Sequence, residues 1–175
     1  MEATLTLHDE QGISSTSVRD IAARAAVAPS TVLQHFPQMS ELIRACGQLS
    51  SQLAPMPGQL LLSGVDRPAE RVQRMAAAMF EWWELLGRGL DHLRTDRRRL
   101  PDVEAWFSDV EGRHRSLAAA ALQAHRDAER VDLLVALTTP DAWAALRAAG
   151  LDAGRAAARV ARLICPQPDS KEAVH

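Results

Sequence analysis

Apolar positions along the first fifty residues recur in runs with a period of three to four, the spacing of one face of a helix. Turn residues separate the runs: Gly12 stops the first, and Pro29 suits the first turn of the third, where its missing N–H has no helical partner. Ser17 and Asp20 have the spacing of a capping box that opens the second run. The pattern predicts helices over residues 2–11, 18–26, 29–36 and 40–53.

The clearest break in the chain is the run Pro55-Met56-Pro57-Gly58. Beyond it, apolar residues near heptad spacing predict the longest helix, from residue 66 to about residue 94, and a charged loop of arginines follows. Further helices are expected over residues 101–127, 128–137, 140–149 and 152–165. The predicted parts are a head of residues 1–50, a body of residues 55–166 and a loose, disordered tail of residues 167–175.

The composition favours a fold built only from helices. The 175 residues are 47% apolar and 24% charged, which is typical of a folded chain with a sizeable core. Arginine outnumbers lysine nineteen to one, alanine is abundant and tyrosine is absent. Alanine and arginine favour helix, and few β-branched or aromatic residues remain for strands. We therefore expect an all-α protein.

Several classes of protein lose support because their motifs are missing. Cys46 and Cys165 form no CxxC pair or Cys/His cluster, which argues against a disulfide framework and a structural zinc and indicates a reducing, cytoplasmic compartment. Apolar runs are far shorter than the roughly 20 residues of a membrane span. No GxSxG, P-loop, HExxH or dinucleotide fingerprint occurs, so we expect neither an enzyme nor a cofactor. His114 and His125 are three turns apart on one predicted helix, too far to chelate a metal ion together.

Residues 17–36, SVRDIAARAAVAPSTVLQHF, have the pattern of a helix-turn-helix, in which the second of two short helices is apolar behind and polar in front. With this element the sequence resembles the tetracycline-repressor (TetR) family of bacterial transcriptional regulators. Residues 137–164 are similar to the family's last two helices, with a Thr-Pro-acid start and a glycine between them. In the head, the resemblance rests on Gly12, residues 17–22, Val27, Ser30-Thr31, His35-Phe36-Pro37 and Glu41-Leu42.

The resemblance implies that the second helix of this element binds DNA. Glutamine can read base edges, while hydroxyls, arginine and helix N-termini can hold phosphates. Without the resemblance, these positions would be read as solvated polar residues of a small helical bundle. The residues carried over from the family are Pro29, Ser30, Thr31, Gln34 and His35 in the major groove, with Ser17 and Arg19 near the DNA backbone.

The head also departs from the family's usual pattern. Ala26, Ala28, Leu33 and Met39 stand where glycine, a capping serine, a tyrosine and a lysine are usual. Residues 1–50 carry three arginines against five acidic residues, a net charge of −2, and counterion release at phosphates supplies most non-specific affinity. Three explanations stay open: a regulator with weak, narrow DNA specificity, a start site that has lost residues, and a family member that no longer binds DNA.

In the family, the body holds a pocket for a small effector. Large apolar and aromatic side chains dominate such pockets, although Met and Trp at helical spacing are more often plain core. Gly87 and Gly89 weaken a helix, so a bend or a close helix contact is expected near them. The candidate effector residues are Met75, Met79, Phe80, Trp83, Leu86, Trp106 and Phe107, with His114 as a further candidate.

The family's last two helices form its dimer interface. The candidates here are Trp143, Leu146, Ala153, Ala157, Val160 and Ile164, and packing within the monomer is the alternative. The sequence thus indicates a homodimeric regulator that binds a palindromic double-stranded operator and responds to a small molecule with an apolar or aromatic part. Repression relieved by ligand is the usual outcome in the family. The alternative function is a TetR-like fold that has lost DNA binding and serves as a small-molecule or protein-binding module.

Overall fold

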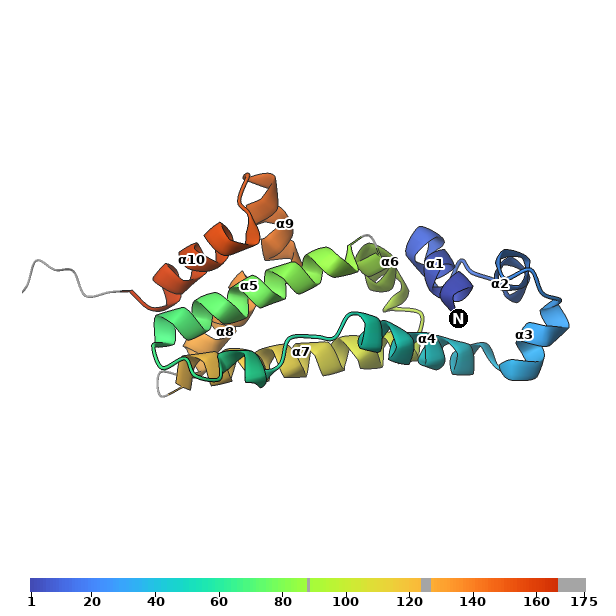
Figure 1. Cartoon of the computed structure of the whole chain (residues 1–175), viewed down its shortest axis with the longest axis horizontal. Helices are drawn as coiled ribbons and strands as arrows, with labels where there is room; N and C mark the ends of the chain where they lie inside the picture. The colour runs from blue at the N-terminus through green and yellow to red at the C-terminus, as the bar shows by residue number, and fades with distance from the viewer. Residues whose placement is uncertain (88, 124–126, 167–175) are drawn as a thin grey trace, which may run out of the picture. The chain divides into compact units, whose positions relative to one another are not determined.

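The computed structural model of the chain describes residues 1–87, 89–123 and 127–166, and every regular element in them is a helix (Figure 1). The all-α expectation is therefore confirmed. The predicted tail of residues 167–175 and His125 lie outside the described residues. The helices are α1 (Glu2–Gln11), α2 (Val18–Arg24), α3 (Pro29–His35), α4 (Met39–Leu53), the 3-10 helix η1 (Gln59–Leu62), α5 (Pro68–Leu86), α6 (Gly89–Asp96), α7 (Pro101–Leu122), α8 (Ala128–Leu137), α9 (Pro140–Ala148) and α10 (Ala153–Ile164).

Most predicted helices lie within a few residues of their expected bounds, because capping residues mark them. Thr139 and Asp152 cap α9 and α10 by accepting hydrogen bonds from backbone N–H groups three residues on. The longest predicted helix is wrong in one respect: it divides into α5 and α6. Gly87 ends α5 with a φ of 50°, a left-handed conformation that a continuing helix cannot contain.

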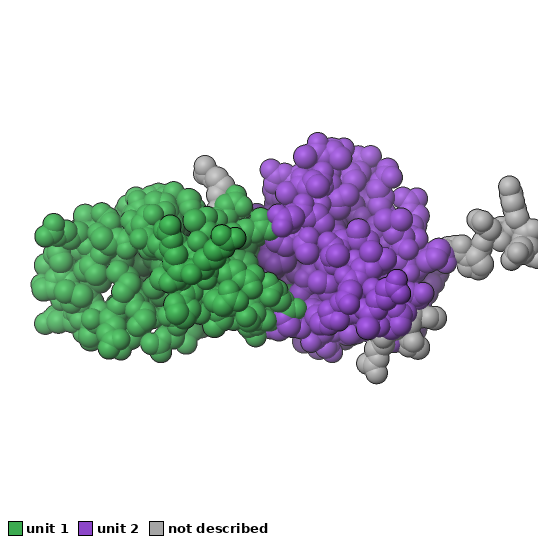
Figure 2. Space-filling view, turned by 180° about the vertical axis from the view of Figure 1, so that it is seen from behind, with its two compact units in different colours: residues 1–56, 85–111 green, residues 57–84, 112–175 purple. Residues whose placement is uncertain are grey.

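The chain forms two compact units, which do not coincide with the predicted head of residues 1–50 and body of residues 55–166. Unit 1 consists of residues 1–56 and 85–111, and unit 2 of residues 57–84 together with residues from 112 onward (Figure 2). The difference arises because α6 packs against α1, which brings residues 85–111 into the same unit as the head. Sequence periodicity reports which face of a helix is buried, but not against which distant helix.

The core of unit 1 holds the first four helices together. Its buried side chains come from α1, α2, α3 and α4, so each helix of the head contributes to one cluster. Met39, at a position where lysine is usual in the family, packs against this cluster. The buried members are Leu7, Ile21, Ala22, Val32, Leu42 and Cys46.

The core of unit 2 forms around α5 and the last three helices, which pack against one another in pairs (Figure 1). Two side chains from other helices bind Thr138 at the end of α8. The indole N–H of Trp83 donates to its carbonyl oxygen at 2.9 Å, and Nε2 of His114 lies 2.8 Å from its hydroxyl oxygen. In the described part of the chain, no helix combines the length and the apolar character needed to cross a lipid bilayer.

Candidate nucleic-acid interface

Helix α2 begins with the predicted capping box. Ser17 Oγ accepts a hydrogen bond from the backbone N–H of Asp20 at 3.2 Å, and the Asp20 carboxylate accepts from the backbone N–H of Ser17 at 2.8 Å. The Ser17 hydroxyl also donates to that carboxylate at 2.6 Å. These hydrogen bonds lower the pKa of Asp20, and the bond from the Ser17 side chain has the largest effect. The hydroxyl that was expected near a phosphate therefore already donates its proton within the helix cap.

The turn between α2 and α3 is a Schellman motif with alanine at its left-handed position. The backbone N–H of Val27 donates to the carbonyl oxygen of Ala22 at 3.0 Å, and that of Ala26 donates to Ala23 at 3.2 Å. Ala26 has a φ of 54°, where a Cβ atom costs about 1 kcal/mol relative to glycine. The helix-turn-helix thus keeps its turn geometry without the usual glycine.

Helix α3 exposes most of the residues expected to face DNA. Ser30, Gln34 and His35 are exposed, and Thr31 is half-buried because Val32 beside it enters the core. The helix also presents Leu33, whose side chain is 48% exposed. An exposed apolar side chain among polar ones fits contact with a thymine methyl group in the major groove. Pro29, in the first turn of α3, and Arg19, near the start of α2, are exposed as well.

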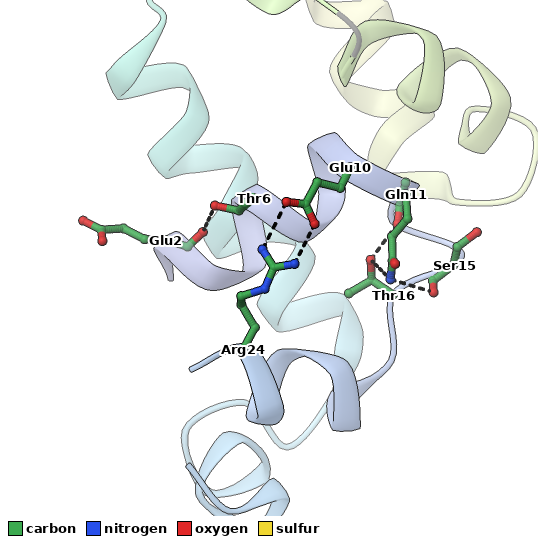
Figure 3. A network of polar contacts seen from close by, with 8 residues as sticks. Glu2, Thr6, Glu10, Gln11, Ser15, Thr16 and Arg24 are labelled. Carbon is green, nitrogen blue, oxygen red and sulfur yellow. Dashed lines mark hydrogen bonds and ion pairs between the residues drawn. The ribbon is translucent and has the colours of Figure 1, made fainter. Parts of the chain in front are cut away.

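Few cations of the head are available for phosphates. Arg24 on α2 forms a bidentate ion pair with Glu10 on α1, at 2.6 Å and 3.2 Å (Figure 3). This pair lowers the pKa of Glu10 through its hydrogen bonds with the guanidinium. Arg44 lies 3.7 Å from a carboxylate oxygen of Asp102. Of the three arginines in residues 1–50, Arg19 alone forms no ion pair with a described residue.

The loop between α1 and α2 is fixed by side chains of α1 and α6. The Gln11 amide donates to the carbonyl oxygen of Ser15 at 3.1 Å and to Thr16 Oγ1 at 3.3 Å (Figure 3). From α6, the buried carboxylate of Asp96 accepts from the backbone N–H groups of Ile13 at 2.7 Å and Ser14 at 3.2 Å. These contacts hold the entry to α2 in place.

The predicted effector residues fall into two groups. In unit 2, Met75, Met79 and Phe80 have no exposed surface, and the Phe80 ring stacks on Trp143 at 5.0 Å between centroids. Trp83, in the same unit, is bound to Thr138 as described above. In unit 1, Leu86 and Trp106 line a small cavity, while Phe107 meets the edge of Trp106 and the guanidinium of Arg97. Which of them contact an effector stays a prediction.

The predicted dimer residues differ in how much surface they offer. Four of them are buried within the single chain, which is what packing within the monomer would require: Trp143, Ala157, Val160 and Ile164. Leu146 and Ala153 are half-buried and keep some surface for a partner. A larger exposed apolar side chain on α10 is Leu163, at 66% exposure, which the sequence analysis did not select.

Sequence reasoning also missed a group of polar residues on α1 and α6. Burial lowers the pKa of His8, against the opposite effect of the Asp96 carboxylate. Asp9 comes so close to α6 that a Cβ added at Gly89 would lie 2.5 Å from its Oδ1. The expectation of a close helix contact near Gly89 was the one signal of this approach. Among the described residues, no three His, Cys, Asp or Glu side chains gather as a metal site requires.

Comparisons with known proteins agree with this geometry. Residues 1–46 match the sequence family described as "Bacterial regulatory proteins, tetR family". The comparison with curated proteins found no match. Among solved structures, a TetR-like transcriptional regulator from Rhodococcus sp. RHA1 has a similar fold, with a TM-score of 0.64 and 17% sequence identity over 93% of this chain and 90% of that one. Residues 1–46 are thus similar to the tetR family of bacterial regulatory proteins, and the fold of the chain is similar to that of a TetR-like transcriptional regulator.

Proposed function

We propose that the protein is a dimeric, ligand-responsive transcriptional regulator that binds a palindromic operator through α3. The observation that supports this function best is the α2–α3 element, whose turn is hydrogen-bonded and whose second helix exposes Ser30, Gln34 and His35. In a two-fold dimer, two such helices enter successive major grooves about 34 Å apart. A ligand that favours a different spacing of the two heads lowers the affinity for DNA, so we expect repression to be relieved by ligand.

The DNA-binding proposal is tested by a gel shift at low salt with the DNA upstream of the protein's own gene. Gln34→Ala is expected to lose about tenfold or more in affinity, since a bidentate contact to a base contributes about 1–3 kcal/mol. Gln48→Ala is the matched control, because Gln48 is an exposed glutamine of the head on α4. Equal affinities of the two variants would exclude α3 as the reading helix.

The alternative is a binding module that keeps the fold and has lost DNA binding. The net charge of −2 over residues 1–50 and the pairing of Arg24 with Glu10 favour it. A protein that is dimeric and folded but shifts no DNA, even at low salt, would favour this alternative over the regulator.

We propose α9 and α10 as the dimer surface, formed by their exposed residues. Ala157 has no exposed surface, so a charged residue there would disrupt the protomer and report little about association. Leu163→Arg is the better test, with Leu60→Arg as control, because Leu60 is an exposed leucine of unit 2 outside these helices. Sedimentation should show a weakened dimer for Leu163→Arg alone. A dimer of unchanged stability in both variants would exclude α10 from the interface.

A further inference from the structure

A small cavity in unit 1 lies against α1, the first helix of the head. It has a volume of about 100 Å³ and is lined by residues of α1, α4, α6 and α7. Its wall is mainly apolar, with Leu5, Ile43, Leu93, Val103 and Trp106 among the lining residues. An apolar cavity with a few polar groups is the usual form of a small-molecule site.

One of the polar groups, His8, has an unmet hydrogen bond. Its side chain lines the cavity and the residue is 8% exposed, yet no described group hydrogen-bonds its Nε2. A buried polar nitrogen without a partner costs about 1–3 kcal/mol. A neutral imidazole accepts a hydrogen bond at one of its two nitrogens. The cavity therefore gains from an occupant that carries an N–H or O–H donor.

The charges around the cavity favour a cation as that donor. Asp9 and Asp102 both line it, while no lysine or arginine is among its described lining residues. Asp102 already has Arg44 as a partner, but Asp9 forms no ion pair with a described residue. Because position 89 is glycine, the Asp9 carboxylate can lie directly against α6. The other titratable groups at the lining are Cys46 and His92. Burial raises the pKa of the Cys46 thiol to about 11. Burial also raises the pKa of Asp9, and the nearby His92 acts in the opposite direction.

Acidic residues also line a neighbouring groove. A more open groove of about 480 Å³ shares Asp9, Leu86, Gly89 and His92 with the cavity and adds Glu10. A cation in this groove would lie beside the carboxylates of Asp9 and Glu10, of which Glu10 already pairs with Arg24. Opposite charges in a cleft raise the local concentration of the ligand.

The size of the cavity limits the occupant. An apolar cavity of about 150 Å³ is known to hold benzene, so one of about 100 Å³ holds a slightly smaller body. We propose that this cavity binds a small organic cation: an ammonium group on an apolar body of about four carbon atoms. The Asp9 carboxylate supplies the counter-charge, and Nε2 of His8 supplies a hydrogen-bond acceptor.

The position of the cavity gives such a ligand a way to act on the head. Its walls include α1 and α4, which also hold the core under α2 and α3. A ligand that binds one arrangement of these helices more tightly than another shifts the head toward that arrangement. This regulatory step rests on the proposed DNA-binding function, whereas the binding of the cation does not. The two are therefore tested separately.

Binding is tested on the full chain without DNA, by following the indole N–H resonance of Trp106 and the histidine ring resonances during titration near neutral pH. The probe is n-butylammonium, with n-butanol as the neutral analogue, butyrate as the anion and ammonium chloride as the salt control. Saturable shifts are expected for n-butylammonium with a Kd of about 1 mM. At least about tenfold weaker binding is expected for n-butanol, and no saturable shift for butyrate or ammonium.

Two variants identify the site. Gly47→Leu should abolish binding, because Gly47 lines the cavity and a Cβ added there meets no atom within 4 Å. Gly112→Leu, on α7 in unit 2, is the matched control, since its added Cβ is equally free of contacts. Asp9→Asn should weaken n-butylammonium about tenfold and leave n-butanol unchanged. All variants are first checked for native helicity by circular dichroism.

Three results would overturn the proposal: no saturable shift with n-butylammonium, equal binding by Gly47→Leu and Gly112→Leu, or tighter binding of butyrate than of the amine. The regulatory step is read afterwards, as the change in DNA affinity with saturating n-butylammonium. Binding without such a change would leave the cavity as a cation site and reject its coupling to the head. Failure of the gel shift itself would concern the proposed function and leave the binding result intact.

Discussion

The Asp96 carboxylate provides the sharpest test of how α6 stabilises the head. It is 4% exposed and accepts hydrogen bonds from the backbone N–H groups of Ile13 at 2.7 Å and Ser14 at 3.2 Å. Hydrogen bonds to a charged group contribute about 1.5–3 kcal/mol each, and the longer one contributes less, so Asp96→Ala should lower the free energy of unfolding by about 3 kcal/mol. Both N–H groups donate to the same oxygen, so the amide oxygen of Asp96→Asn can still accept both hydrogen bonds. Because that oxygen carries no full charge, Asp96→Asn should lose about half as much.

The assay is urea unfolding followed by circular dichroism, combined with hydrogen exchange of the peptide that contains Ile13 and Ser14. Asp91→Ala is the control on the same helix: its side chain is 77% exposed and its contact with Arg94 is 3.9 Å long, so the loss should stay below about 1 kcal/mol. Protection of the two amides should fall only in the Asp96 variants. If Asp96→Ala and Asp91→Ala unfolded at the same urea concentration with the same protection, the buried carboxylate would not stabilise this loop.

Three further predictions follow from single side chains. Burial lowers the pKa of His114 from 6.5 to about 4, so His114 stays neutral in the folded protein at pH values where the unfolded chain takes up a proton. The stability advantage of the wild type over His114→Gln should therefore shrink by up to about 3 kcal/mol as the pH falls from 6.5 to about 4. A difference that stays constant with pH would contradict this prediction. In the same urea assay, Ala26→Gly should raise the free energy of unfolding by about 0.5–1 kcal/mol, because Ala26 has a positive φ. Ala25→Gly, at a φ of −84°, should lower the free energy of unfolding by a similar amount. If both variants changed the free energy of unfolding in the same direction and by the same amount, Ala26 would not be strained. In each head, Arg19 is the one arginine that forms no ion pair with a described residue. A plot of log affinity against log salt should therefore have a slope of about −2 to −4, and Arg19→Ala should make the slope shallower by about 2. A slope of about −8 would mean that other cations bind phosphate.

The sequence predicted local structure well because local structure depends on neighbouring residues. The capping box at Ser17 and the positive φ near Ala26 both follow from short stretches whose hydrogen bonds close within a few positions. Gly87 and Gly89 led us to expect a bend or a close contact where α5 and α6 divide. The division itself was not predicted, since the apolar spacing continues across Gly87 although the backbone there turns out of the helix. A period reports the direction of side chains and does not report a change in the axis.

Long-range contacts could not be predicted from the same information. Asp96 lies 83 positions from Ile13, and no pattern around either residue indicates the other. The sequence likewise showed that α10 has an apolar stripe, but Ala157 and Val160 occupy the interior of the protomer, and Leu163 at its edge is exposed. The cavity beside His8 is lined by four separate parts of the chain, so its candidate role emerged only from the folded arrangement.

The discontinuous composition of unit 1 affects how the head can be exchanged between proteins. A chimera that transfers residues 1–56 alone would leave behind Asp96 and the walls that Val103 and Trp106 provide, together with the glycine that admits Asp9. Such a graft would place Leu5 and His8 against a foreign surface. A change of DNA specificity is therefore better made by replacing the exposed residues of α3 alone. No residue of α3 lines the cavity or contacts Asp96 among the described contacts.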